Sequence, residues 1–234
     1  EATSSDQVIK AFSLDNIGLE LLKLGTFTSG AIDTYEISYT RPVLRDNRYE
    51  YQFTIKLQPF MTTAQQASVK QYVQAQASLI AQQASSDLDK VMLVNELITR
   101  SFSYSFDTAT TPHAPYALIS EGKGVCQAYA LLAYELLHTL NLEVYYMTGN
   151  AEGVAHAWNL VKIDGQWYNL DTTYNDPLFN DPTINRAFQT SYAHLLLSDA
   201  VIRSTHARDF THFPAATSSK YDALYSSISG SYTA

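Results

Sequence analysis

The chain contains a single cysteine, Cys126, and the residues around it favour a reactive thiol. Gly122 and Gly124 stand just before it, and apolar residues at helical spacing follow over residues 128–140. The glycines permit a tight turn, so we expect Cys126 in the first turn of a buried helix. At that position the free N–H groups and the helix dipole favour a thiolate over a thiol. The sequence therefore predicts that Cys126 is a nucleophile.

A histidine and an aspartate that could serve this thiol lie on one predicted β-hairpin, residues 154–177. The pair Asp164-Gly165 is a strong signal for a two-residue turn between two strands. In the register that this turn sets, His156 lies on the same face as Asp171 and diagonally across from it. Diagonal neighbours have Cβ atoms roughly 7–8 Å apart, within reach of an imidazole–carboxylate contact. The spacing thus predicts a nucleophile, a base and an orienting acid, namely Cys126, His156 and Asp171.

Three sequence motifs carry a resemblance to a known family. They are GVCQAYA around the cysteine, AHAWN around the histidine and WYNLDTTYNDP around the aspartate. Together and in this order they resemble the transglutaminase-like superfamily, and most of all its secreted bacterial members. The similarity extends from about Leu88 to about Tyr225, and it departs from the family pattern at Tyr174, where tryptophan is usual. The resemblance implies a papain-like core that uses Cys, His and Asp in this chain order.

Each of these features has a simpler interpretation when it is taken alone. A buried cysteine is often a small apolar core residue, and a histidine beside an aspartate is often a structural hydrogen bond. Here the three motifs occur together, in the family order and with matched spacing. That conjunction favours a catalytic site over coincidence.

The remaining elements predict an α+β fold. Helical patterns cover residues 5–25, 62–85 and 87–100, with Ser86 as the cap of the last helix. Alternating polar and apolar residues predict an antiparallel pair of strands over residues 35–39 and 49–57. Further strands are predicted over residues 143–148 and 192–197, and a short helix after Ser198.

With the resemblance, these elements suggest a transglutaminase-like core in which the nucleophile helix packs on an antiparallel sheet. An N-terminal extension of helix and strands precedes that core. We expect residues 1–86 to form the extension, which comprises a helix, a β-hairpin and a helix rich in glutamine and alanine. Residues 87–234 form the expected catalytic domain.

Residues 102–120 are aromatic and contain two prolines, so we expect a loop close to the site. Acyl transfer needs hydrogen-bond donors aimed at the developing oxyanion. The backbone N–H of Cys126 is one candidate, and the side chain of Tyr104 or Tyr116 could be the second. The simpler alternative for each tyrosine is an ordinary half-buried side chain.

We predict no metal and no cofactor. The Asn-Asp-Pro turns at residues 175–177 and 180–182 contain many oxygen ligands but lack the regular alternation of an EF-hand. The remaining histidines show no metal-ligand spacing, and we expect them to be structural; they are His113, His138, His194, His206 and His212.

Charge and composition limit the possible partners and location. The net charge of −8 argues against nucleic-acid binding, and no apolar run is long enough to span a membrane. One cysteine cannot form an internal disulfide, which suits a cytosolic protein or a secreted one. The resemblance favours a secreted or cell-surface protein, and the first residue, Glu1, suggests a mature form without its signal peptide.

The predicted activity is cysteine-dependent acyl transfer on a peptide or protein carboxamide through a thioester intermediate. Transfer to water makes the protein a peptidase, an amidase or a deamidase, and transfer to an amine makes it a transamidase. The sequence leaves these outcomes open. The expected substrate class is a peptide or protein, such as a cell-wall or surface protein. The alternative function is a cell-surface module that binds a peptide or protein in a vestigial catalytic cleft.

Overall fold

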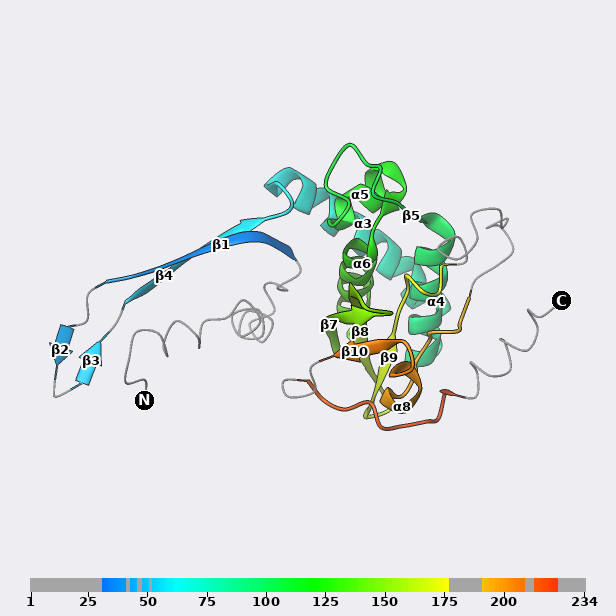
Figure 1. The fold of residues 1–234 in the computed structure, drawn as a ribbon. Helices are drawn as coiled ribbons and strands as arrows, with labels where there is room; N and C mark the ends of the chain where they lie inside the picture. The colour runs from blue at the N-terminus through cyan, green and yellow to red at the C-terminus, as the bar shows by residue number, and fades with distance from the viewer. Residues whose placement is uncertain are drawn as a thin grey trace. The chain divides into compact units, whose positions relative to one another are not determined.

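The computed structural model describes residues 31–40, 43–45, 48–50, 52–176, 191–208 and 213–222 of the 234-residue chain (Figure 1). The chain divides into two compact units, Glu1–Thr62 and Thr63–Ala234. Within the described residues, no helix combines the length and the apolar character needed to cross a membrane.

The first unit contains the predicted antiparallel pair of strands. Strand β1 (Ile32–Tyr39) pairs with β4 (Phe53–Pro59), and the short strands β2 (Val43–Arg45) and β3 (Arg48–Glu50) pair with each other. The helix expected over residues 5–25 lies outside the described residues.

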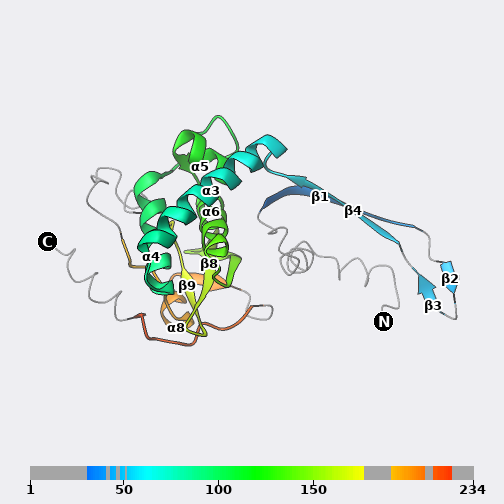
Figure 2. The same cartoon turned by 180° about the vertical axis from the view of Figure 1, so that it is seen from behind.

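Helix α6 (Cys126–Thr139) is the central element of the second unit. Its side chains from Ala128 to Leu137 are all buried except that of Glu135. A helix that is apolar on every side needs cover all round. Helices α3 (Thr63–Gln83), α4 (Asp87–Ser101) and α5 (Pro115–Glu121) supply it together with strands of the main sheet (Figure 2).

The main sheet has four antiparallel strands in the order β10-β7-β8-β9. They are β7 (Val144–Ala151), β8 (Val154–Ile163), β9 (Gln166–Leu170) and β10 (His206–Arg208). Strands β7 and β8 pack against α6. The predicted α+β fold, with the helix that begins at Cys126 packed on an antiparallel sheet, is therefore confirmed.

The β8–β9 hairpin has the register that the sequence predicts. Asp164 and Gly165 have φ angles of 52° and 78°, which is the left-handed backbone of a type I′ turn. Ile163 consequently pairs with Gln166, and the ladder continues to the pair Asn159–Leu170. The register is set by local turn chemistry, which explains why the sequence was sufficient to predict it.

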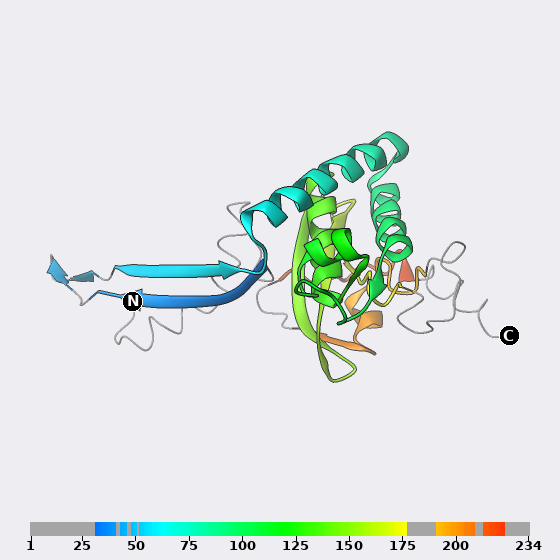
Figure 3. The same ribbon diagram turned by 90° about the horizontal axis from the view of Figure 1, so that it is seen from above.

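Helices α3 and α4 are joined by a sharp turn (Figure 3). Ser86 caps α4 as predicted, because its hydroxyl accepts a hydrogen bond from the N–H of Asp89 at 3.1 Å. The boundary between the compact units lies before α3, whereas the sequence analysis expected it after residue 86. The difference concerns α3 alone, and its contacts with α5 and α6 assign it to the second unit.

The loop expected over residues 102–120 contains regular structure. Strand β5 (Ser103–Tyr104) pairs in parallel with β6 (Lys123–Gly124), and Pro115 begins helix α5. Proline is compatible with the first turn of a helix because the N–H that it lacks has no partner there.

The region after the hairpin also differs in part from the prediction. Residues 192–197 form turns with one isolated β-bridge, between Leu197 and Asn169, instead of the expected strand. Helix α8 (Asp199–Ile202) does follow Ser198, whose hydroxyl accepts from the N–H of Val201. Strand β10, which comes next, has no counterpart in the prediction.

Candidate active site

Cys126 is the first residue of α6, as the sequence predicts. The strand before it passes so close to α5 and α6 that Gly124 has no room for a side chain, since a Cβ there would lie 2.8 Å from Leu118 Cδ2. The N–H of Val125, the residue at the helix N-cap, donates to the carbonyl of Pro112 at 3.0 Å. Close packing at Gly124 and the backbone hydrogen bond of Val125 together hold the chain just before the thiol.

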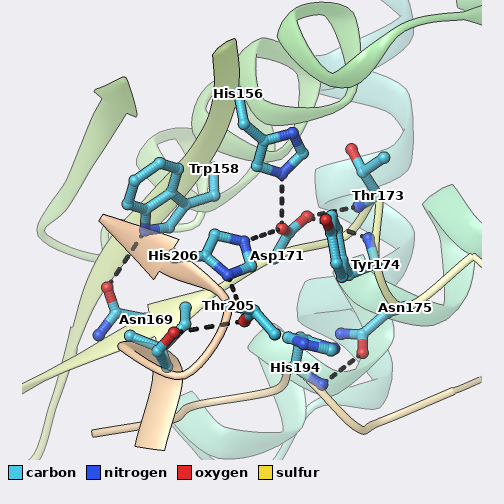
Figure 4. A network of polar contacts seen from close by, with 11 residues as sticks. His156, Trp158, Asn169, Asp171, Thr173, Tyr174, Asn175, His194, Thr205 and His206 are labelled. Carbon is cyan, nitrogen blue, oxygen red and sulfur yellow. Dashed lines mark hydrogen bonds and ion pairs between the residues drawn. The ribbon is translucent and has the colours of Figure 1, made fainter. Parts of the chain in front are cut away.

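His156 projects from β8 and contacts both of its predicted partners. Its Nε2 lies 2.7 Å from Oδ2 of Asp171 (Figure 4), and the ring is also hydrogen-bonded to the side chain of Cys126. Because Nε2 is engaged by Asp171, Nδ1 is the nitrogen left for the thiol. The structure thus brings together the three residues that the sequence singled out.

Asp171 is fully buried and accepts four hydrogen bonds. Its Oδ2 receives His156 and His206, the latter at 2.8 Å, while Oδ1 receives the backbone N–H groups of Thr173 and Tyr174 at 2.9 and 3.1 Å. Burial alone would raise the pKa of the carboxyl group, but the bonds from the two histidines hold that pKa well below its usual range. Asp171 is therefore ionised at neutral pH.

The protonation state of His156 depends on the two side chains that it contacts. Burial lowers the pKa of the imidazole, but hydrogen bonds to Asp171 and Cys126, together with the negative charge of both, raise it to about 10. At neutral pH the ring carries a proton on each nitrogen. An imidazolium in this position can donate a proton to a leaving amine beside the thiol.

His206 is a member of this network that the sequence analysis assigned to a structural role. It comes from β10, and its second ring nitrogen, Nδ1, lies 2.7 Å from Oγ1 of Thr205 (Figure 4). The contact with Asp171 depends on the pairing of β10 with β7, which are more than fifty residues apart in the sequence. No turn signal or periodicity marks a three-residue strand, so the sequence offered no local indication of it.

Tyrosine side chains from three elements lie near the thiol. Burial is the main reason that the pKa values of Tyr104 and Tyr174 are raised to about 12, and the charge of Cys126 adds to it in both cases. The same two causes raise the pKa of Tyr146 on β7. All three hydroxyls therefore stay protonated at neutral pH, and that of Tyr174 is hydrogen-bonded to Glu152.

The two proposed oxyanion residues differ in their position. Tyr104 is in β5, and its interaction with Cys126 places it at the site. Tyr116 is in the first turn of α5, where its carbonyl accepts a hydrogen bond from Ser120. Of these two tyrosines, Tyr104 is the one with an interaction with Cys126 among the described contacts, so it is the better candidate.

Three side chains at the site could in principle hold a metal ion. Ligand atoms of His156, Asp171 and His206 all lie within 4.8 Å of one another, and no other such group occurs in the described part of the chain. Both histidines, however, lie at hydrogen-bond distance from one carboxylate oxygen. A zinc ion would need its own place, about 2.0–2.2 Å from every ligand atom. We therefore assign the contacts to hydrogen bonds.

Residues of the first Asn-Asp-Pro turn form hydrogen bonds with helices α4 and α6. The amide of Asn175 donates to Oδ1 of Asn95 at 2.8 Å, and Asp176 accepts from the hydroxyl of Tyr129 at 2.7 Å. Oδ1 of Asn175 accepts from the N–H of His194 at 2.7 Å, so the side-chain oxygens of both residues have partners inside the protein. The second turn, residues 180–182, lies outside the described residues.

Treatment with a chelator is expected to leave the site unchanged. After dialysis against EDTA, the rate at which iodoacetamide alkylates Cys126 and the thermal midpoint should both equal those of the untreated protein. Intact-mass spectrometry measures the alkylation rate. A rate that changed on chelation and returned with added calcium or zinc would contradict the assignment of these side chains to hydrogen bonds.

Comparisons with known proteins identify sequence relatives over most of the chain. The chain is 22% identical over 196 residues to the kyphoscoliosis peptidases of Mus musculus and Homo sapiens. The match covers 77% of this chain but only 29% of each relative, so the chain spans less than a third of their length.

The solved structures that the chain resembles share little sequence with it. A transglutaminase (TGase) is 17% identical, with a TM-score of 0.44 over 76% of this chain and 52% of that one. A putative cysteine protease from Cytophaga hutchinsonii is 15% identical, with a TM-score of 0.39 over 61% and 65%. Calcium-bound LapG of Legionella pneumophila is also 15% identical, with a TM-score of 0.29 over 66% and 98%.

The family model of the transglutaminase-like superfamily matches residues 74–172. This region begins within α3, includes the whole of α6 and the β8–β9 hairpin, and ends one residue after Asp171. The matched stretch contains Cys126, His156 and Asp171.

Proposed function

We propose that the protein catalyses acyl transfer from a peptide or protein amide, with Cys126 as the nucleophile. The observation that carries this proposal is the chain of contacts from Cys126 to His156 and from His156 to Asp171 at the start of a buried helix. The family match supports a cysteine-dependent enzyme, as do the relatives that are named peptidases.

In the first step the sulfur of Cys126 attacks the carbonyl carbon of the amide. The C–N bond then breaks, His156 gives its proton to the departing nitrogen, and a thioester remains. In the second step an acceptor loses a proton to His156 and attacks the thioester, which frees the thiolate. Asp171 orients the ring and stabilises its positive charge throughout.

We propose that two hydrogen-bond donors stabilise the oxyanion, namely the N–H of Cys126 and the hydroxyl of Tyr104. The interaction of Tyr104 with Cys126 supports this assignment, as does the raised pKa that keeps the hydroxyl protonated. Donors that are already in position stabilise charge as it develops, without a cost of reorganisation.

The acceptor determines which reaction the protein performs, and one experiment separates the possibilities. A library of glutamine-containing peptides is incubated with the protein in the presence and absence of a primary amine, and the products are identified by mass spectrometry. Cleaved peptides indicate a peptidase, glutamate in place of glutamine indicates a deamidase, and amine adducts indicate a transamidase. If no product forms while Cys126 remains alkylatable, acyl transfer is excluded and the binding module becomes the better hypothesis.

Exposed apolar side chains beside the site suggest which substrates it accepts. Phe106 is 67% exposed, and its ring meets that of Tyr104 edge-on at 5.9 Å. Val154 is 69% exposed and lies two residues before His156 on β8, so the two side chains share one face of the strand. We propose that Phe106 and Val154 contact large apolar residues on either side of the reacting amide.

Replacement of Phe106 by alanine should weaken binding without altering the chemistry. We expect KM for a peptide with an aromatic residue next to the reacting amide to rise by about tenfold, because burial of one large apolar side chain contributes about 1.5–3 kcal/mol. The value of kcat should stay within about twofold. Leu79→Ala on α3, where the side chain is 50% exposed, is the matched control and should change neither constant. A KM equal to that of the wild type would remove Phe106 from the substrate site.

We further propose that the protein acts in a secreted form or at the cell surface, on a surface or cell-wall protein. The resemblance to secreted bacterial members of the family supports this proposal. Fractionation of source cells, followed by detection of the protein in the medium and surface fractions, tests it. Recovery in the cytosol alone would contradict it.

A further inference from the structure

The carboxylate of Asp171 has two imidazole partners, and the proposed mechanism uses only one of them. His156 and His206 both approach Oδ2, at 2.7 and 2.8 Å, from different strands of the sheet (Figure 4). His206 is 4% exposed, so bulk water contributes little to its interactions. His206 therefore contacts the proposed orienting residue without having a role in the proposed reaction steps.

We propose that His206 is a positioning residue, which donates its Nε2 proton to Asp171 and holds the carboxylate in the orientation that receives His156. The inference deepens the proposed function and rests on it for the role of His156. It does not require His206 to touch the substrate or to exchange a proton during the reaction.

The surroundings of Asp171 show why such a partner is needed. The residue stands just beyond the end of β9, where the regular ladder of the hairpin has stopped. Its Oδ1 is held by two backbone N–H groups, whereas Oδ2 is held only by side chains. Without His206, one side of a buried, charged oxygen would lack a donor, and that costs free energy. The carboxylate would then gain by rotating toward another donor and away from His156.

Thr205 determines which nitrogen of His206 carries the proton. Its Oγ1 is 2.7 Å from Nδ1 of His206 and 3.3 Å from the carbonyl oxygen of Ile202. The carboxylate of Asp171 can only accept, so Nε2 of His206 must carry a proton. We assign the hydroxyl proton of Thr205 to the shorter contact, with Nδ1 as its acceptor, which favours the tautomer that donates to Asp171.

The strand that carries His206 is held against β7 by close contacts. A Cβ on Gly149 would lie 2.1 Å from the carbonyl oxygen of Ala207 and 2.7 Å from Cη2 of Trp158, so only glycine allows this approach. At one end of β10 the N–H of Glu152 donates to the carbonyl of Thr205 at 2.9 Å. The position of His206 is therefore fixed by the backbone.

Aromatic rings enclose His206 on the side of the site. The ring centroids of His156, Trp158, Tyr174 and His194 lie between 4.9 and 5.8 Å from its own. Of the titratable groups packed around it, Asp171 is the anion, and His194 has its pKa lowered to about 4 by burial, so that ring is neutral above pH 5. The charges that His206 faces at neutral pH are therefore those of Asp171 and His156.

The test compares His206→Ala with His206→Gln and reads the reactivity of Cys126 directly. The rate of alkylation by iodoacetamide is measured across pH by intact mass, and the thermal midpoint is recorded for each variant. We expect the alanine variant to react about tenfold more slowly at neutral pH, the size of effect that follows loss of one hydrogen bond to a charged group. The glutamine variant should stay within about threefold of the wild type, because its amide N–H can take the place of Nε2–H.

The pH profile distinguishes positioning from simple packing. Hydrogen bonds from His206 and His156 lower the pKa of Asp171. In the plot of alkylation rate against pH, removal of His206 should therefore move the rise on the acidic side, called the acid limb here, to higher pH. A variant that only loosened the packing would lower the thermal midpoint and leave the limb in place. His138→Ala, at the exposed end of α6, is the control and should match the wild type in both measurements.

A second variant tests the role assigned to Thr205. Thr205→Val removes the hydroxyl and keeps the shape, so it should slow alkylation about threefold in the wild-type background. In the His206→Gln background it should have no further effect, because an amide has no tautomer to select. Nitrogen chemical shifts in NMR spectra should show the proton of His206 on Nε2.

Three results would overturn the inference. They are a wild-type pH profile in His206→Ala, equal losses in the alanine and glutamine variants at unchanged thermal midpoints, and a His206 ring protonated on Nδ1 alone. If His206→Ala does not fold, the glutamine and valine variants decide the question. Alkylation needs no substrate, so a failure to find acyl transfer would leave this test valid.

Discussion

Replacement of Cys126 by alanine is expected to abolish acyl transfer while the fold is retained. The sulfur is the atom that forms the thioester in the proposed reaction, and no other cysteine can replace it, since the chain has only one. Loss of a catalytic nucleophile typically lowers kcat by about 10³-fold or more. The side chain is only half-buried, and its removal should change the free energy of unfolding by roughly 1 kcal/mol or less.

The measurement is turnover of the best peptide found in the library, together with the thermal midpoint. Cys126→Ser is the matched variant, because it keeps a polar atom in place of the sulfur but provides a far weaker nucleophile beside the same histidine. Both variants should retain the wild-type midpoint. Substantial turnover by the alanine variant would show that another residue performs the chemistry.

Replacement of Asp171 by asparagine should impair both activity and stability. An asparagine has one carbonyl oxygen, whereas Asp171 accepts hydrogen bonds at both of its oxygens. Whichever way the amide is turned, its NH₂ group faces two donors and leaves them without an acceptor. We expect turnover to fall by roughly 10³–10⁴-fold, the effect known when the orienting carboxylate of a catalytic triad is converted to an amide.

A comparison of the thermal midpoints of the wild type and Asp171→Asn across pH reports the charge state of His156. The pKa of the ring is raised to about 10 in the folded protein, against about 6.5 in an unfolded chain. The stabilisation is therefore fully present below about pH 6.5 and is lost as the pH rises toward 10. The thermal midpoint of the wild type should fall over this interval, and that of Asp171→Asn should fall less, because the main anionic partner of the ring is missing.

Two outcomes would contradict this account of Asp171. Parallel stability curves for the wild type and Asp171→Asn between pH 6.5 and 10 would mean that the carboxylate does not hold the charge on His156. Near-normal turnover by the variant would mean that another group orients the ring.

The parts of the site that could be predicted are those that depend on neighbours in the sequence. The turn at Asp164-Gly165 sets the register of the hairpin, and the register alone places His156 near Asp171. The apolar residues after Cys126 likewise predict a buried helix that begins there. Both features follow from turn chemistry and periodicity, which act over a few residues.

The parts that escaped prediction depend on contacts between distant segments. His206 reaches Asp171 only because β10 pairs with β7, and neither strand contains a signal for the other. Tyr146 and Tyr174 lie near the thiol through the packing of separate elements. Helix α5 was missed for a different reason, because Pro115 was interpreted as a loop signal when it also suits the first turn of a helix.

The placement of β10 determines how long a fragment of this chain must be to contain the whole site. The family match ends at residue 172, so a fragment trimmed to it would retain Cys126, His156 and Asp171 and would lose β10. In such a fragment β7 would become an open sheet edge. The buried carboxylate would lose three of its four donors, which are His206 and the N–H groups of Thr173 and Tyr174. The smallest piece of this chain that keeps both a complete hydrogen-bond shell around Asp171 and the whole of β10 must extend at least through residue 208.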